Sequence, residues 1–106
     1  METFELAELA VAQDAIRHAL TFTHAKLVIV TEPGTRLWYV EVDEVNELDV
    51  LHHFADAEDI RVVLTGTTIG GRKFEGNGFL HPNPKHRAAA IRGDGELLGY
   101  GMSTGA

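Results

Sequence analysis

The chain has 106 residues and a formal net charge of −7, from 16 acidic residues against 9 lysines and arginines. A surface with this charge repels a phosphate backbone, so we expect no nucleic-acid partner. The sequence contains no cysteine, which excludes disulfides, thiolate metal ligands and a cysteine nucleophile.

No targeting or membrane-spanning segment is evident. The N-terminus is acidic where a secretion signal would be basic, and no apolar run approaches the roughly 20 residues that cross a bilayer. We therefore expect a cytoplasmic protein with no membrane partner. The length suits one core, so we predict a single α+β domain at residues 1–98 and a flexible glycine-rich C-terminal tail at residues 99–106.

The N-terminal segment has apolar residues at helical spacing. Leu9, Ala12, Ile16 and Ala19 form one stripe, and Thr3 is a suitable N-terminal cap. This pattern predicts a helix over residues 4–20.

A β-hairpin is predicted next. The apolar, β-branched run of residues 26–31 ends at Pro33-Gly34, which favours a tight turn. In the following arm, Trp38, Val40 and Val42 alternate with Leu37, Tyr39 and Glu41. We expect one of these two faces to be part of the core.

Helical spacing returns at residues 43–55, and acidic residues are concentrated in the first turns. The β-branched content of residues 60–68 predicts a strand, and two or more strands fit after Gly70. The order is α-β-β-α-β-β-β. It predicts an α+β fold with a mostly antiparallel sheet of about five strands and two helices.

Two similar glycine-rich segments occur in the last third, at residues 76–80 and 93–97. Asn77-Gly78 and Asp94-Gly95 are dipeptides that favour hairpin turns of type I′, although bulges also contain such pairs. The short strands broken by glycine pairs resemble the strand-rich parts of self-assembling virion subunits such as phage tail-tube proteins. That resemblance implies self-assembly.

Histidine is unusually frequent, with six residues, and neutral imidazole is a good ligand for zinc and related metals. His81 and His86 flank a short segment stiffened by two prolines, which predicts that they lie near one another. A metal site would combine this segment with His52 or His53. These two residues are separated by about 100° on a helix, so only one of them could serve.

The same residues support two further predictions, an anion site and an acid-base pair. Lys85, His86 and Arg87 supply three donors on a rigid turn and are suited to an anion. His52 or His53 beside Asp56 or Asp59 would be a possible acid-base pair, because a carboxylate can orient an imidazole.

Three functions follow from these patterns. The leading hypothesis is a protein-interaction or self-assembly module without catalytic activity, binding itself or another protein, for example by pairing a sheet edge. It requires no cofactor. The alternatives are a histidine-dependent metal-binding domain or small acid-base enzyme, and a binder of a small ligand or anion.

Overall fold

A computed structural model of the chain describes residues 1–99. The predicted tail at residues 99–106 lies outside this range, except for Gly99. Within it, no helix is both long enough and apolar enough to cross a membrane.

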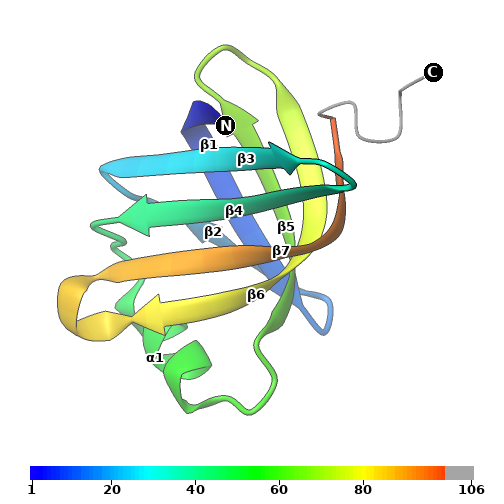
Figure 1. Cartoon of the computed structure of the whole chain (residues 1–106). Helices are drawn as coiled ribbons and strands as arrows, with labels where there is room; N and C mark the ends of the chain where they lie inside the picture. Colours follow the sequence, from blue (N-terminus) through cyan, green and yellow to red (C-terminus); the bar gives the residue numbers. More distant parts are fainter. Residues whose placement is uncertain (100–106) are drawn as a thin grey trace.

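The fold is a closed antiparallel β-barrel (Figure 1). The elements in chain order are β1 (Glu2–Gln13), β2 (Ile16–Leu20), β3 (His24–Glu32), β4 (Thr35–Asp43), α1 (Leu48–Asp56), β5 (Arg61–Thr68), β6 (Lys73–Asn83), the short 3-10 helix η1 (Pro84–His86) and β7 (Ala88–Leu98). The sheet order is β2-β1-β3-β4-β7-β6-β5, and β5 pairs back onto β1. Six strands therefore close the barrel, and β2 pairs alongside the C-terminal part of β1.

The predicted α+β class is wrong. The described chain has seven strands and one α-helix in place of five strands and two helices. Closing the sheet pairs the outermost strands with one another, so the fold needs no second helix to cover an open face.

The predicted helix over residues 4–20 is instead the β1–β2 hairpin. Its turn is Asp14-Ala15, and both residues have positive φ, at 51° and 66°. The apolar stripe that predicted the helix crosses this turn, since Leu9 is buried in β1 whereas Ile16 and Ala19 in β2 are exposed. A bulge at Ala7 adds a second irregularity, because Leu6 and Glu8 face consecutive residues of β5. The extra residue shifts the alternation, so the inward side chains Leu6 and Leu9 stand three apart, a spacing typical of a helix.

The hairpin at Pro33-Gly34 is confirmed as β3–β4, which pairs in register from His24 with Asp43 to Glu32 with Thr35. The alternation in its second arm is confirmed as well. Trp38, Val40 and Val42 are at most 3% exposed and belong to one buried apolar cluster inside the barrel.

The second helix is shorter than predicted, because β4 continues to Asp43 and α1 begins at Leu48. Its buried residues Val50, Leu51 and Phe54 belong to the core cluster, and Figure 1 shows α1 at one end of the barrel.

Thr21 forms hydrogen bonds with Glu47, the residue that precedes α1. The two carboxylate oxygens of Glu47 accept hydrogen bonds of 2.7 Å from the Thr21 backbone N–H and hydroxyl.

Neither glycine pair forms a turn. Both lie within strands, Gly76 and Gly78 in β6 and Gly93 and Gly95 in β7. The β6–β7 register shifts after Gly76, so Gly95 lies in a bulge, with φ at +85°. A Cβ on Gly93 would overlap the Trp38 indole, and one on Gly76 would lie 2.7 Å from its Cζ2 atom. These glycines make room for tryptophan inside a narrow barrel.

Candidate functional site

The four histidines proposed as ligands are all exposed on the surface. His81 is exposed on β6, opposite Ala90, and His86 is exposed in η1. His52 and His53 are exposed on α1, at the covered end of the barrel. Residues 1–99 contain no group of three or more histidine or acidic side chains placed to hold a metal ion.

The anion and acid-base readings gain no added support from the contacts. Lys85, His86 and Arg87 are all exposed, and the Arg87 backbone N–H bonds the Pro84 carbonyl oxygen. His53 Nε2 lies 3.5 Å from Gln13 Oε1, and within residues 1–99 no hydrogen bond joins it to Asp56 or Asp59. Both readings stay predictions.

Barrel closure limits binding through sheet edges, the route first considered for assembly. Within the described residues, β2 pairs with β1 alone and keeps one free edge. That edge is only five residues long. A short edge offers few main-chain groups to a partner strand, so the broad outer surfaces of the barrel are better candidates.

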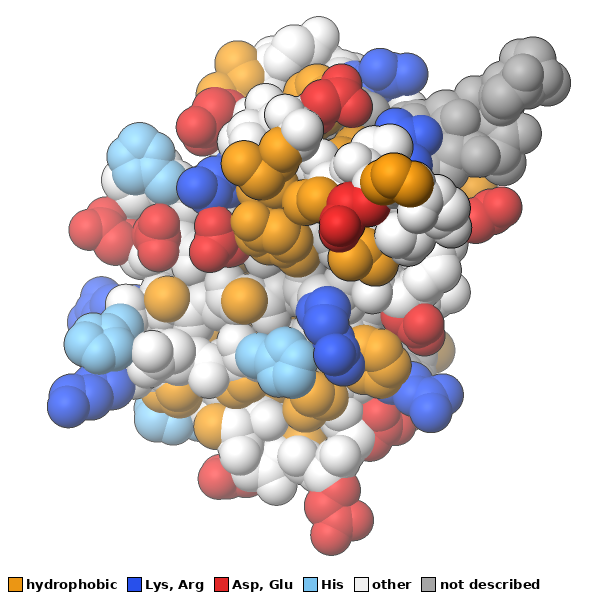
Figure 2. All heavy atoms as spheres, in the orientation of Figure 1, with side chains coloured by type: hydrophobic (Ala, Val, Ile, Leu, Met, Phe, Trp, Pro, Cys, Tyr) orange, Lys and Arg blue, Asp and Glu red, His pale blue; other side chains and the backbone are white. Residues whose placement is uncertain are grey.

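The outer surface of β3 and β4 carries an apolar block. Leu37 and Tyr39 point away from the core, since they alternate with buried Trp38 and Val40. In register, Leu37 lies opposite Val30 and Tyr39 opposite Val28. Figure 2 shows hydrophobic side chains gathered over these two strands. Cross-strand partners share one face of a sheet, so the four residues form one surface.

Exposure differs across this block. Leu37 is 53% exposed, Val30 and Tyr39 are half-buried, and Val28 is buried although it does not belong to the core cluster. Val28 is therefore covered by its neighbours on the outside of the barrel. Leu37, Val30 and Tyr39 are therefore the accessible residues of the block, and Val28 lies beneath them.

A charged row borders the apolar block on the same two strands. Lys26 lies opposite Glu41, and the Lys26 Nζ to Glu41 Oε1 distance is 3.4 Å. Both side chains remain nearly half exposed. We call the six residues Lys26, Val28, Val30, Leu37, Tyr39 and Glu41 the β3–β4 face.

The next strand continues this surface. Arg92 of β7 lies opposite Tyr39, and its guanidinium carbon is 5.1 Å from the centre of the Phe79 ring on β6. This cation–π contact holds a positive charge at the border of the apolar block. The β3–β4 face is thus apolar at its centre with charges of both signs around it, an arrangement typical of protein contact surfaces.

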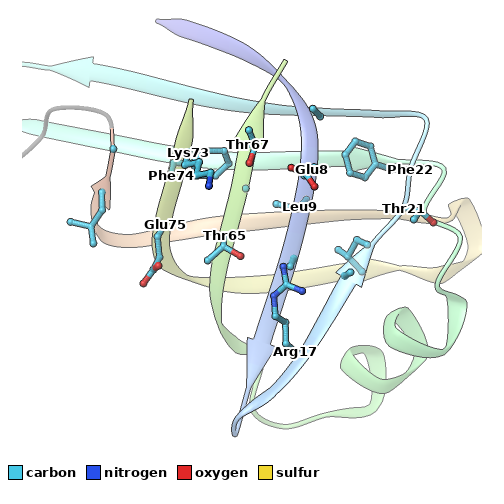
Figure 3. A pocket seen from close by; sticks show the side chains of 17 residues that line it. Glu8, Leu9, Arg17, Thr21, Phe22, Thr65, Thr67, Lys73, Phe74 and Glu75 are labelled. Carbon is cyan, nitrogen blue, oxygen red and sulfur yellow. The ribbon is translucent and has the colours of Figure 1, made fainter. Parts of the chain in front are cut away.

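A groove of about 800 Å³ lies elsewhere, where β2, β1, β5 and β6 run side by side. Its floor is built of small residues in one row, Ala19, Ala10 and Thr65, which are cross-strand partners. Figure 3 shows Arg17 and Phe22 on one side of the groove and Lys73 and Glu75 on the other.

The groove carries unpaired charges. Within residues 1–99, Glu8, Arg17, Lys73 and Glu75 form no ion pair with one another or with other described side chains. Its cations and acids balance, so its formal charge is near zero in a protein with a net charge of −7. Such a site is better suited to a dipolar ligand than to a simple anion.

No protein-family model, curated protein or solved structure matches the chain. Function is therefore inferred from the side chains.

Neither the β3–β4 face nor the groove was among the predicted site residues. A signal for the face was present, because residues 27–30 are apolar at every position while a half-exposed antiparallel strand alternates. The groove had no comparable signal. Its walls come from strands that are distant in sequence and meet only when the barrel closes.

Proposed function

We propose that this protein is a protein-interaction module that binds its partner through the β3–β4 face. The observation that carries the proposal is the apolar block of Val28, Val30, Leu37 and Tyr39 on the outside of a barrel that already has a complete core. An outward strand face in contact with water is normally polar. Apolar residues clustered in register therefore point to a surface that is covered when the protein works.

The energetics favour contact at this face. Covering a fully exposed leucine contributes roughly 1.5–3 kcal/mol, so covering Leu37 would contribute about half of that. Tyrosine is also common at interfaces, because its ring is apolar and its hydroxyl can stay hydrated or form a hydrogen bond. Polar neighbours at the rim, Lys26 and Glu41 among them, give the contact its specificity.

A site-specific photocrosslinker tests the proposal. A benzophenone amino acid replaces Leu37 in one variant and Val63 in the control, since Val63 is a 41% exposed aliphatic residue on β5. After irradiation in cells, adducts are separated on gels and identified by mass spectrometry. We expect discrete protein adducts from position 37 and none from position 63. No adduct from position 37, or the same adducts from both positions, would refute the proposal.

A second function is favoured by the groove between β2 and β6. Its volume of about 800 Å³ lies within the usual range of small-molecule sites, and its charged rim is unpaired. A thermal-shift screen with dipeptides and amino acids would show it as a rise in melting temperature. Ala19→Trp, which fills the floor from an exposed position, should remove that rise.

A further inference from the structure

We infer that the partner of the β3–β4 face is a second copy of this chain, packed face to face about a two-fold axis that runs along the seam between β3 and β4. The inference rests on the proposed function and names its partner. It follows from the register of the two strands and from the signs of the charges on them.

The face is built of rows of cross-strand partners. Val30 with Leu37 and Val28 with Tyr39 make two apolar rows, and Lys26 with Glu41 makes a charged row. The next rows outward are His24 with Asp43 at one end and Glu32 with Thr35 at the other. In the charged row the basic residue is on β3 and the acidic residue is on β4.

A two-fold axis parallel to the strands places β3 of one copy over β4 of the other. A residue of one copy then faces, in the second copy, the residue that is its cross-strand partner within its own chain. Lys26 therefore faces Glu41 of the second copy, and Leu37 faces Val30 of the second copy. Both apolar rows meet apolar rows, and Lys26 and Glu41 each meet a residue of opposite charge, so the centre of the surface is complementary to itself.

A two-fold axis across the strands pairs the charges less completely. Through the Val28–Tyr39 row, it sets Lys26 and Glu41 against Val30 and Leu37 of the second copy, which would bury charges against apolar side chains. Midway between the two apolar rows, it sets Lys26 against Glu32 of the second copy but leaves Glu41 against Thr35. The axis along the seam gives both Lys26 and Glu41 a partner of opposite charge, so the arrangement of charges favours it.

The width of the apolar block matches the strip over which two barrels can touch. The outer surface of a closed barrel is convex, so two copies touch mainly along the strands nearest the axis. The apolar block is confined to β3 and β4, which is the strip that such a contact covers. An interface of this size is small, and we expect the dimer to dissociate on dilution.

Charge exchange tests this geometry by sedimentation velocity over a concentration series. With Lys26→Glu, an acid at position 26 of each copy faces Glu41 of the other copy. With Glu41→Lys, a base at position 41 of each copy faces Lys26 of the other copy. Each single variant should raise the dissociation constant by roughly tenfold or more. An equimolar mixture of the two single variants should dimerise again, because each acidic pair then faces a basic pair. The double variant Lys26→Glu/Glu41→Lys should also dimerise.

The controls separate folding from association. Lys85→Glu makes the same charge change on η1, away from the face, and should leave the dimer unchanged. Far-ultraviolet circular dichroism should be alike in all variants, since the Lys26–Glu41 pair within one chain is exposed and contributes little to stability.

Two results would overturn the inference. One is a wild-type protein that stays monomeric at every concentration, and the other is a mixture of the single variants that stays monomeric. The crosslinking experiment distinguishes these results from failure of the proposed function. If the β3–β4 face binds no protein, the crosslinker at position 37 gives no adduct. If the face binds a different protein, the crosslinker gives an adduct with that protein and not with a second copy of the chain.

Discussion

The indole of Trp38 on β4 lies directly against the backbone of Gly93 on β7, and its Nε1–H donates a 3.0 Å hydrogen bond to the carbonyl oxygen of Gly95. One side chain therefore joins two strands through packing and through a hydrogen bond. Trp38 is 3% exposed, so both interactions lie inside the barrel, where an unmet N–H would be costly. The contact explains why β7 carries glycine at a position that faces the core.

We expect Gly93→Ala to destabilise the protein by about 1–3 kcal/mol, because the added methyl group overlaps the Trp38 indole. Urea denaturation measures the change. Ala90→Val is the control, since Ala90 lies on the outer face of the same strand. Equal stability of Gly93→Ala and wild type would show that the indole is not held where the structure places it.

The same contact predicts coupling between the two positions. Trp38→Leu removes the ring, so Gly93→Ala should cost much less in that background than in wild type. A double-mutant cycle should give a coupling free energy of about 1 kcal/mol or more. Additive effects would contradict direct contact between these residues.

The β1–β2 turn should be improved by a glycine. Ala15 has a φ of 66°, in the left-handed region where a Cβ is unfavourable. Ala15→Gly should therefore raise the free energy of unfolding by about 1 kcal/mol, because glycine adopts this conformation without strain. The same substitution at exposed Ala55 on α1 should have the opposite sign, since glycine weakens helices. If both variants were destabilised, the turn would not have the described geometry.

Glu47 should stabilise the junction between α1 and the bend that follows β2. Glu47→Ala removes two hydrogen bonds to Thr21, and we expect a loss of about 1–2 kcal/mol in thermal or urea unfolding. Glu58→Ala serves as a control, because Glu58 is exposed in the loop after α1. A change no larger than that of the control would mean that the Thr21 contacts contribute nothing to stability.

Metal removal should leave the barrel intact. The six histidines belong to no metal-binding group within residues 1–99, so EDTA should not lower the melting temperature. Protein purified without an affinity tag and analysed for zinc before and after chelation provides the measurement. A fall in melting temperature on chelation, reversed by zinc, would support the metal hypothesis.

Sequence patterns that act over a few residues predicted real elements. Pro33-Gly34 and the alternation of Trp38, Val40 and Val42 correctly predicted the β3–β4 hairpin and the two faces of its second arm, because turn geometry and strand periodicity are local properties. The strand at residues 60–68 was predicted for the same reason, as β5 confirms. The charge and the missing cysteines likewise restricted the chemistry without reference to a fold.

Local patterns failed for the N-terminal segment. Its apolar stripe crosses the Asp14-Ala15 turn, and only the pairing of β1 with β2 and β5 shows that Leu9 faces the core while Ile16 is exposed. The two glycine pairs were wrongly predicted to form turns because their role depends on a distant residue. They make room for Trp38, which lies 57 residues before Gly95 in the chain.

By itself, the sequence determined the turn at Pro33-Gly34, the strands on either side of it, the strand at residues 61–68, the overall charge and the absence of cysteine chemistry. Tertiary structure alone decided that the sheet closes on itself, that glycines lie beneath a tryptophan, and that Val28, Val30, Leu37 and Tyr39 share an outer surface. The reason is physical. Turn and strand preferences arise from neighbouring residues, whereas closure, packing and the composition of a surface depend on pairings between strands that are distant along the chain.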